Sequence, residues 1–495
     1  MFVNQSKVFC RNKVGVYYPC LKLALKVVVY NLENPAKFEF YWVSRLAMYQ
    51  TKILSALLAK LLVMSKLKEI KKNAAGIDLG SAEFYVSVDG VTVRSFETFT
   101  SSIIELIKYL KEHFIKTVAM ESTGVLWIPL YDMLEKEGFE VFLVNAAHAK
   151  NIPAQKSDPA DCRWLQKLHS YGLLRASFVP QDAIRRLRTF MRLREDHLDM
   201  ASSHIQHMQR AMELMNLKLK NVISQLHGAS GLRIINAILA GERDPVILTE
   251  LCEITILKHK KNKVQESLKG NYKEEYIFLL KQAYQAWQFY QEQIKECDAQ
   301  IEKLLDEATC KILLSDTGSP KPSRHNCPQI KGLHDKIVKL NQGRNATQIS
   351  GISDTTMLKL TAELGFDYSK WPSEKHFVSW LGLSPKKHQS GKLRKRKRNN
   401  AKTKGGQIFK ECAMSIANSK HLALKGFYHR IKTKHGARAA NKATARKLAV
   451  LYYRFMTKGM EYVEIGLIEY EKRYKEIMIK NLCRKARGLG LQVVA

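Results

Sequence analysis

Four carboxylates stand at positions that suit metal-assisted chemistry on phosphate. Asp78 lies inside an apolar run typical of a buried strand, where an unpaired charge is costly. Glu121 ends a second such run, and Asp158 and Asp161 are three residues apart at a helix start, so they share a face. Four carboxylates brought together repel unless cations join them, and ligand sets made only of oxygen suit Mg²⁺ or Mn²⁺. Two such ions can activate an attacking oxygen and stabilise a leaving one.

Each acid also has a simpler interpretation to be weighed. Asp158 alone could be a helix cap, and Asp161 a first-turn acid favoured by the helix dipole. Asp78 has no such structural role, because a strand interior disfavours aspartate. Asp89 is the contrast: it belongs to an Asp-Gly hairpin turn, and we assign it no function.

A basic run follows much later in the chain. Residues 386–404 read KKHQSGKLRKRKRNNAKTK, with ten Lys or Arg in 19 residues and no acid. A solvated charge run or a localisation signal is one interpretation, but phosphate binding fits this density better. A serine in a basic loop commonly has no role, yet Ser390 beside a glycine and among cations could attack phosphorus. The predicted nucleic-acid contacts are Lys386, Lys387, Lys392, Arg394, Lys395, Arg396, Lys397, Arg398, Lys402 and Lys404.

The acids need a sheet to hold them, and residues 64–180 predict one. The expected order is three strands, a helix, a strand, a helix, a strand and a helix. Three antiparallel strands followed by parallel ones with helical crossovers is the ribonuclease-H-like arrangement, in which the acids meet at one sheet edge. The expected strands are 75–79, 84–88, 91–96, 117–120 and 140–144, and the helices are 101–114, 126–136 and 159–171.

The remainder of the chain is predicted to be mostly helical. Apolar residues step by three and four over 198–226 and 276–304, which predicts a coiled-coil hairpin or its oligomeric equivalent. An Ile-Ser-Gly-Ile-Ser run at 349–353 resembles half of a helix-hairpin-helix. The predicted fold is thus α/β plus α. Its parts are an extension without an evident role (1–63), the metal-dependent catalytic domain (64–180), the coiled-coil region (181–314), a linker (315–346), the C-terminal domain (347–470) and a basic tail (471–495).

The charge balance predicts a polyanionic partner. The chain has 81 basic and 46 acidic residues, a net charge of +35. Nucleic acid is the first candidate, and an anionic membrane surface the second. No apolar run is long enough to span a bilayer, so we expect no membrane partner. Nine widely spaced cysteines without a Cys-x-x-Cys pair disfavour a zinc ribbon and predict a reducing, cytoplasmic location.

The sequence resembles the insertion-sequence-110 family of bacterial transposases, the recombinases guided by a bridge RNA. The motifs that carry the resemblance run in family order over about residues 64–460. They are Gly-Ile-Asp-Leu-Gly (76–80), Met-Glu-Ser-Thr-Gly (120–124), Lys-Ser-Asp-Pro-Ala-Asp (156–161), the glycine-bounded run 228–245, Ile-Ser-Gly-Ile-Ser (349–353), Trp-Leu-Gly-Leu-Ser-Pro (380–385) and Gln-Ser-Gly (389–391).

The resemblance implies a reaction and its partners. It implies a RuvC-like metal domain, whose acidic quartet maps onto Asp78, Glu121, Asp158 and Asp161, and a nucleophilic serine that maps onto Ser390. It implies a covalent phosphoserine link to DNA, strand exchange, and a composite site in which one subunit's metal domain joins another's serine domain. The implied partners are donor and target DNA and a guide (bridge) RNA, held by a homo-oligomer, a dimer of dimers, at the bacterial nucleoid.

Two other functions remain open from the sequence. A metal-dependent nuclease of the junction-resolving kind would use the quartet without a covalent serine intermediate. A non-enzymatic nucleic-acid-binding remnant of a transposon would show a broken quartet, whereas all four acids are present here.

Overall fold

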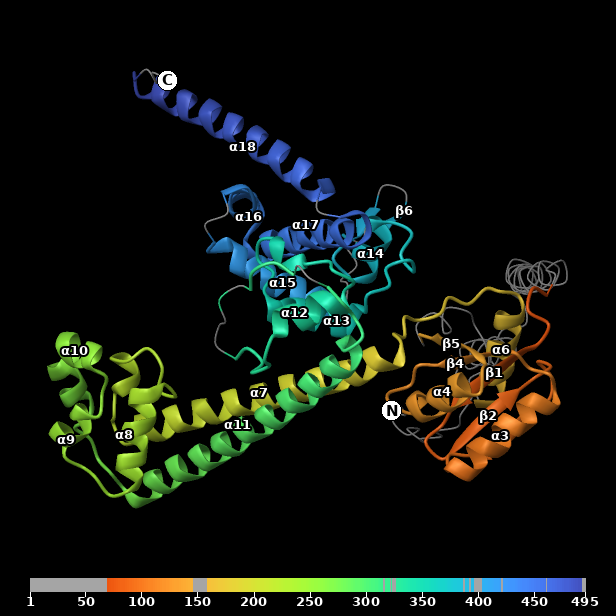
Figure 1. The fold of residues 1–495 in the computed structure, drawn as a ribbon, viewed down its shortest axis with the longest axis horizontal. Coiled ribbons are helices and arrows are strands. Elements are labelled where there is room, and N and C mark those ends of the chain that lie inside the picture. The colour runs from red at the N-terminus through yellow and green to blue at the C-terminus, as the bar shows by residue number, and fades with distance from the viewer. Residues whose placement is uncertain are drawn as a thin grey trace, which may run out of the picture. The chain divides into compact units, whose positions relative to one another are not determined.

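We describe the protein from a computed structural model, over residues 69–145, 158–314, 317–320, 322, 326–385, 388–390, 393–395, 403–419, 422–459 and 461–491. The chain divides into two compact units, Met1–Phe178 and Val179–Ala495, and each is treated by itself (Figure 1). The predicted extension, residues 1–63, lies outside the described residues.

The first unit is built on a mixed five-stranded sheet in the order β3-β2-β1-β4-β5. The β1–β2 and β2–β3 pairs are antiparallel, and the β1–β4 and β4–β5 pairs are parallel, as the sequence predicts. The turn after β2 is stabilised by Asp89, whose Oδ1 accepts the backbone N–H groups of Val91 and Thr92, both at 2.8 Å. The strands are β1 (Ala74–Leu79), β2 (Glu83–Ser87), β3 (Arg94–Glu97), β4 (Thr117–Glu121) and β5 (Glu140–Val144).

Among the described residues of this unit, three helices accompany the sheet: α3 (Thr100–Glu112), α4 (Trp127–Lys136) and α6 (Asp158–Ser170). The apolar spacing of α3 predicts a buried face of Ile103, Ile104, Ile107 and Leu110, and the structure differs from it at one position. Ile104 is 56% exposed, and Leu106 is fully buried in its place. The apolar residues of α3 occupy a wide face of the helix, so their spacing alone does not tell whether Ile104 or Leu106 is buried.

A long antiparallel helix pair dominates the second unit (Figure 1). It consists of α7 (Asp182–Leu214) and α11 (Glu274–Thr309), which run in opposite directions, since Arg194 meets Asp298 and His204 stacks on Tyr290. The second predicted seam lies wholly inside α11. The prediction that the first helix continues to residue 226 is wrong. It ends at Leu214, and Asn216 turns the chain with a φ of 59°.

The residues beyond that turn form a cap on the helix pair. Its elements are η2 (Leu219–Asn221), α8 (Ala229–Leu239), α9 (Pro245–Glu250) and α10 (Ile254–Ser267). Leu219 and Leu226, whose spacing continues that of the predicted first helix, are buried in the core of this cap together with Ile234 and Leu248. Apolar spacing alone did not separate a continuing helix from a cap core.

In the described residues of the C-terminal part, the regular structure is helical apart from one short hairpin. Part of the predicted linker is folded, because α12 buries Ile337 and Val338. Much of the predicted basic tail is also helical, since α18 reaches Gly488. No helix of the described part of the chain has the length and hydropathy needed to cross a membrane. The elements are α12 (Leu333–Leu340), η3 (Ala346–Gln348), α13 (Asp354–Leu364), α14 (Glu374–Trp380), β6 (His388–Ser390), β7 (Leu393–Lys395), α15 (Lys404–Ala417), α16 (Leu422–His435), α17 (Ala437–Lys458) and α18 (Glu461–Gly488).

Candidate active site

Two parallel strands bring the first two predicted acids to the same edge of the sheet. In the β1–β4 register, Ile77 lies opposite Met120, and Asp78 and Glu121 are the next residue on each strand. Both acids are half-buried. Parallel strands end at a common edge, so the pairing accounts for the proximity that the sequence predicts.

Helix α6 carries the third and fourth acids and packs directly on β1. A Cβ atom at Gly76 would lie 2.3 Å from the carbonyl oxygen of Cys162 and 2.3 Å from the backbone nitrogen of Gln166. Only glycine permits this approach of helix backbone to strand backbone. The side chain of Gln166, which is 5% exposed, donates to the carbonyls of Ala74 at 3.2 Å and Val88 at 3.4 Å. The first turns of α6 are therefore fixed against the strand that bears Asp78.

The electrostatics of Cys162 show how near this helix lies to Asp78. Burial first, and the negative charge of Asp78 second, together raise the pKa of the Cys162 thiol to about 12. Asp161 precedes Cys162 in α6 and is half-buried. Asp78 Oδ1 accepts the backbone N–H of Leu79 at 3.1 Å, a bond that helps to orient the carboxylate.

The acids of this edge suit a hard divalent cation in their chemistry. Asp78, Glu121 and Asp161 offer only carboxylate oxygens, from two strands and the helix packed on them. Among the side chains that the structure describes, no group of three His, Cys, Asp or Glu is close enough to hold a metal. Asp158 begins α6, and its side chain lies outside the described part. The complete quartet stays a prediction.

Ser390 lies in the other unit, on a two-stranded hairpin. It ends β6 and pairs with Leu393 of β7, while Arg394 and Lys395 pair with Gln389 and His388. Most of the remaining basic residues predicted to bind nucleic acid fall outside the described residues: Lys386, Lys387, Lys392, Arg396, Lys397, Arg398 and Lys402.

Lys404 differs from the rest of the basic run, because a protein carboxylate already engages it. It begins α15, and its Nζ lies 3.2 Å from Glu195 Oε2 of α7. Glu195 also pairs with Lys359 at 3.0 Å. These two ion pairs tie α13 and α15 to the helix pair, so the structure gives Lys404 a positioning role that its place in a basic run did not indicate.

Another residue that the sequence reasoning missed is Gln166. Its signal was weak, since a lone glutamine in a helix carries no motif.

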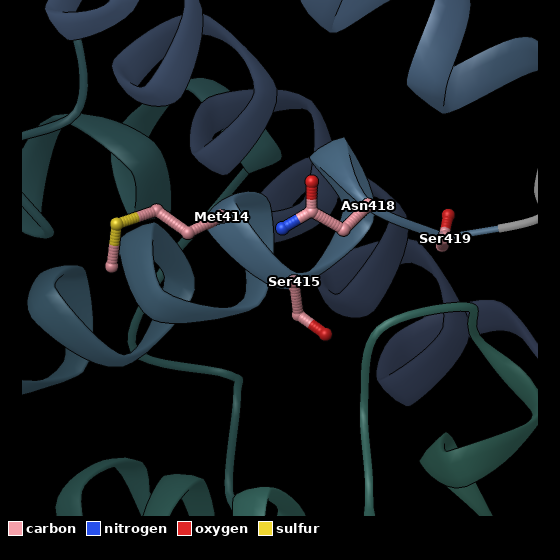
Figure 2. A pocket seen from close by; sticks show the side chains of 4 residues that line it. All are labelled: Met414, Ser415, Asn418 and Ser419. Carbon is pink, nitrogen blue, oxygen red and sulfur yellow. The ribbon is translucent and has the colours of Figure 1, made fainter. Parts of the chain in front are cut away.

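A groove of about 490 Å³ beside the end of α15 adds no further candidate (Figure 2). Its described lining, Met414, Ser415, Asn418 and Ser419, has no charge and no strong nucleophile, and we assign it no role.

Comparison with protein families matches both parts of the chain. Residues 75–216 match a transposase model, the IS110 DEDD transposase domain, which covers the sheet, α6 and α7. Residues 343–429 match the model described as the transposase IS116/IS110/IS902 family. A search of curated proteins returned no significant match. The first model implies a ribonuclease-H-like acidic domain, which the mixed sheet accommodates, and a divalent metal. The chain is therefore an IS110-family transposase, a DNA-processing enzyme of the transposase and recombinase class.

Proposed function

We propose that this transposase is an RNA-guided recombinase of a bacterial insertion sequence, with a metal-binding acidic quartet and a serine nucleophile. The observation that carries the proposal is the close packing of α6 on β1 at Gly76. This packing brings the helix that contains Asp158 and Asp161 against the strand that contains Asp78. The charge of +35 supports nucleic-acid partners. We further propose that α7 and α11 form a coiled coil within a dimer of dimers working at the DNA of the nucleoid.

Asp78, Glu121, Asp158 and Asp161 would hold Mg²⁺ or Mn²⁺ between them. When bound, such ions neutralise phosphate oxygens and stabilise the charge of the transition state. The chain's own part is to fix the carboxylates: the β1–β4 pairing sets Asp78 beside Glu121, and Gln166 holds α6 to the sheet.

Ser390 would supply the nucleophile. Its Oγ forms a bond to a DNA phosphorus while the bond from that phosphorus to one bridging oxygen breaks, and the serine proton ends on the departing oxygen. Basic residues of the same run would stabilise the charged phosphate. The product is a phosphoserine link, which the hydroxyl of a second strand can attack to complete the exchange. A guide RNA would choose both DNAs by base pairing.

The acids can be tested by Mn²⁺ titration and by cleavage of donor DNA. We expect Asp78→Asn, Glu121→Gln, Asp158→Asn and Asp161→Asn each to weaken Mn²⁺ binding by at least about tenfold, since loss of even outer partners costs that much, and to abolish cleavage. Asp89→Asn is the matched control, because this acid serves the hairpin turn. Wild-type recombination by two of the four variants would refute the quartet.

The serine can be tested independently of the acids. Wild-type protein, guide RNA and cleavable DNA should give a denaturant-resistant adduct whose peptide mass maps to Ser390, and Ser390→Ala should form none while binding both nucleic acids. A mixture of Ser390→Ala with Asp78→Ala should regain part of the activity if subunits share the site. Full recombination by Ser390→Ala would instead favour the metal-dependent nuclease.

A further inference from the structure

A pocket of about 600 Å³ lies in the second unit, and neither the four acids nor Ser390 are among its lining residues. Three segments form it: the turn after α12, the loop between α13 and α14, and the last turns of α17. The mechanism proposed above does not use it. Its lining residues are Gln342, Arg344, Phe366, Asp367, Tyr368, Ser369, Trp371, Pro372, Tyr453 and Thr457.

The apolar part of the lining is aromatic and held in place. Tyr368 is 4% exposed, and its hydroxyl donates to the hydroxyl of Tyr452 at 2.9 Å. The hydroxyl of Tyr453 donates to the carbonyl of Trp371. Phe366 is only half-buried and so leaves part of its ring available. Fixed rings with one accessible aromatic face suit a flat, apolar ligand such as a nucleobase.

Arg344 is the one cationic side chain among the described residues that line the pocket. It is half-buried, and its guanidinium has no hydrogen bond or ion pair with any residue that the structure describes. The charge of Arg344 acts on Tyr368 of the same pocket. Burial raises the pKa of Tyr368, and the positive charge of Arg344 lowers it in part. A partly desolvated guanidinium without a partner is costly, and an anion such as a phosphate would relieve that cost.

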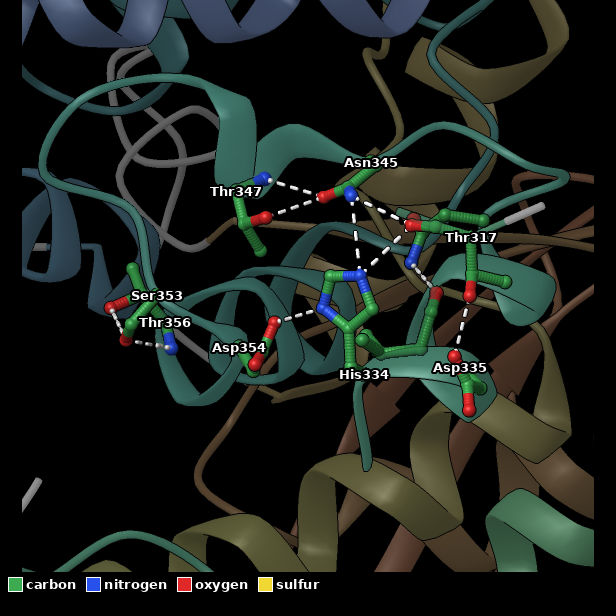
Figure 3. Close-up of polar contacts among 10 residues, drawn as sticks. Thr317, His334, Asp335, Asn345, Thr347, Ser353, Asp354 and Thr356 are labelled. Atoms are coloured by element: carbon green, nitrogen blue, oxygen red, sulfur yellow. Dashed lines mark hydrogen bonds and ion pairs between the residues drawn. The ribbon is translucent and has the colours of Figure 1, made fainter. Parts of the chain in front are cut away.

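Hydrogen bonds of the residues on either side of Arg344 support the turn that presents it, and Figure 3 draws those of Asn345. Asn345 Nδ2 donates to the carbonyl of Thr317 at 2.9 Å, and its Oδ1 accepts the N–H of Thr347 at 3.1 Å. His334 joins the same network, with Nδ1 at 2.7 Å from Asp354 Oδ1. On the other side of Arg344, Asn341 Nδ2 donates to Ile337 at 2.8 Å.

That scaffold makes the pocket preorganised, which lowers the entropy lost on binding. Asp367 and Gln342 add polar groups at the rim that could pair with base edges. A hydrogen bond from Ser369 lowers the pKa of Asp367, so this carboxylate accepts and does not donate. One cation, an accessible aromatic wall and rim acceptors together match one nucleotide and not a duplex.

We propose that this pocket binds an unpaired nucleotide of a nucleic-acid strand, with the base against Phe366 and its phosphate on Arg344. Both DNA and RNA present this chemistry, and strand exchange exposes unpaired nucleotides. The site needs neither the acidic quartet nor Ser390, so it can be tested in EDTA without cleavage, and its failure would leave the recombinase mechanism untouched.

The test compares binding of labelled oligothymidine, oligouridine and a duplex, each of about 20 nucleotides or base pairs, longer than one single-strand site. Phe366→Ala should weaken single-strand binding about tenfold, as expected for loss of one stacked base, and leave duplex binding unchanged. Arg344→Gln should cost a similar factor. The charge-matched control is Lys375→Gln, which removes an exposed lysine of α14 in the same domain. Comparison of the affinities for oligothymidine and oligouridine tells whether the pocket prefers DNA or RNA.

A second readout separates binding from misfolding. 5-Iodouracil placed in the oligonucleotide should cross-link to the peptide that contains Phe366 and Trp371 in wild-type protein, and Arg344→Gln should lose that cross-link while keeping the wild-type melting temperature. Equal single-strand affinity for Phe366→Ala, Arg344→Gln and Lys375→Gln, or cross-links that map only to other peptides, would overturn the proposal.

Discussion

Arg194 and Asp298 meet inside the long helix pair, with Arg194 Nε 2.5 Å from Asp298 Oδ1 and the two side chains 2% and 4% exposed. The other oxygen of Asp298 accepts the backbone N–H of Gln329 at 3.0 Å. One buried carboxylate thus joins α7, α11 and the segment that leads to α12. Because an offset along the helices would leave both charges unpaired, the pair specifies how α7 and α11 align.

Loss of one partner of this pair should be severe. We expect Asp298→Ala, or Arg194→Leu, to lower the free energy of unfolding of the second unit by about 3–5 kcal/mol, since either leaves a buried charge alone. Urea titration followed by helical circular dichroism measures this. The double variant Arg194→Met with Asp298→Leu should recover most of the loss. If it is as unstable as the single variants, the unpaired charge is not the cause.

Gly76→Ala should displace α6 from the sheet. The added Cβ would meet two backbone atoms at 2.3 Å, and backbone cannot rotate away as a side chain can. We expect weaker Mn²⁺ binding and a lower melting temperature of the first unit, by calorimetry. Gly488→Ala, where a Cβ meets nothing within 4 Å, is the control. Unchanged metal affinity in Gly76→Ala would show that the close packing of α6 on β1 does not determine the positions of the acids.

The first unit should lose stability in mild acid through His169. Burial, with a smaller contribution from the charge of Lys71, lowers the pKa of His169 to about 4, against 6.5 ordinarily. The unfolded chain therefore binds this proton first, so stability is present above about pH 6.5 and falls as the pH drops towards 4. The loss should reach roughly 2–3 kcal/mol.

Urea unfolding of the first unit between pH 7.5 and 4.5 measures this dependence. His169→Gln keeps a hydrogen-bonding group for Thr117, which lies 2.8 Å from His169 Nε2, but cannot titrate. The variant should flatten the pH profile. A profile as steep as that of the wild type would assign the acid sensitivity to other groups.

Cys162 should resist alkylation although it lies beside the proposed active site. Its pKa of about 12 keeps the thiol protonated at pH 8, and it is fully buried. A short pulse of iodoacetamide, followed by peptide mass mapping, should label the exposed Cys310 and leave Cys162 unmodified. Labelling of Cys162 at the rate of Cys310 would mean that α6 leaves the sheet often.

Local sequence signals predicted the sheet well, and the reasons are physical. Asp89 and Gly90 specify the hairpin after β2, and apolar runs locate each strand of the mixed sheet. The strand positions of Asp78 and Glu121 follow from the same runs. How closely α6 approaches β1 was not predictable in the same way, because it depends on the fit of Gly76 to backbone atoms 86 and 90 residues away.

Helix ends and polar contacts were harder to predict. The step of three and four residues continues past Leu214 into Leu219 and Leu226, although the chain turns at Asn216. Burial in a cap core selects the same residue types as a helix seam, so spacing does not tell them apart. Lys404 and Glu195 are 209 residues apart in the sequence, and nothing in the basic run around Lys404 indicates that they pair.

The unbroken helix α11 also fixes a spacing within the second unit. Its 36 residues rise about 54 Å, so the cap of α8–α10 is held at a set distance along the pair from the C-terminal helices. That length equals roughly 16 base-pair steps of duplex DNA. Removing one heptad from each of α7 and α11 would preserve their packed faces and shorten this spacing by about 10 Å. A DNA duplex that contacts both ends of the helix pair at once would then have to span a number of base pairs set by the number of helical turns in α7 and α11.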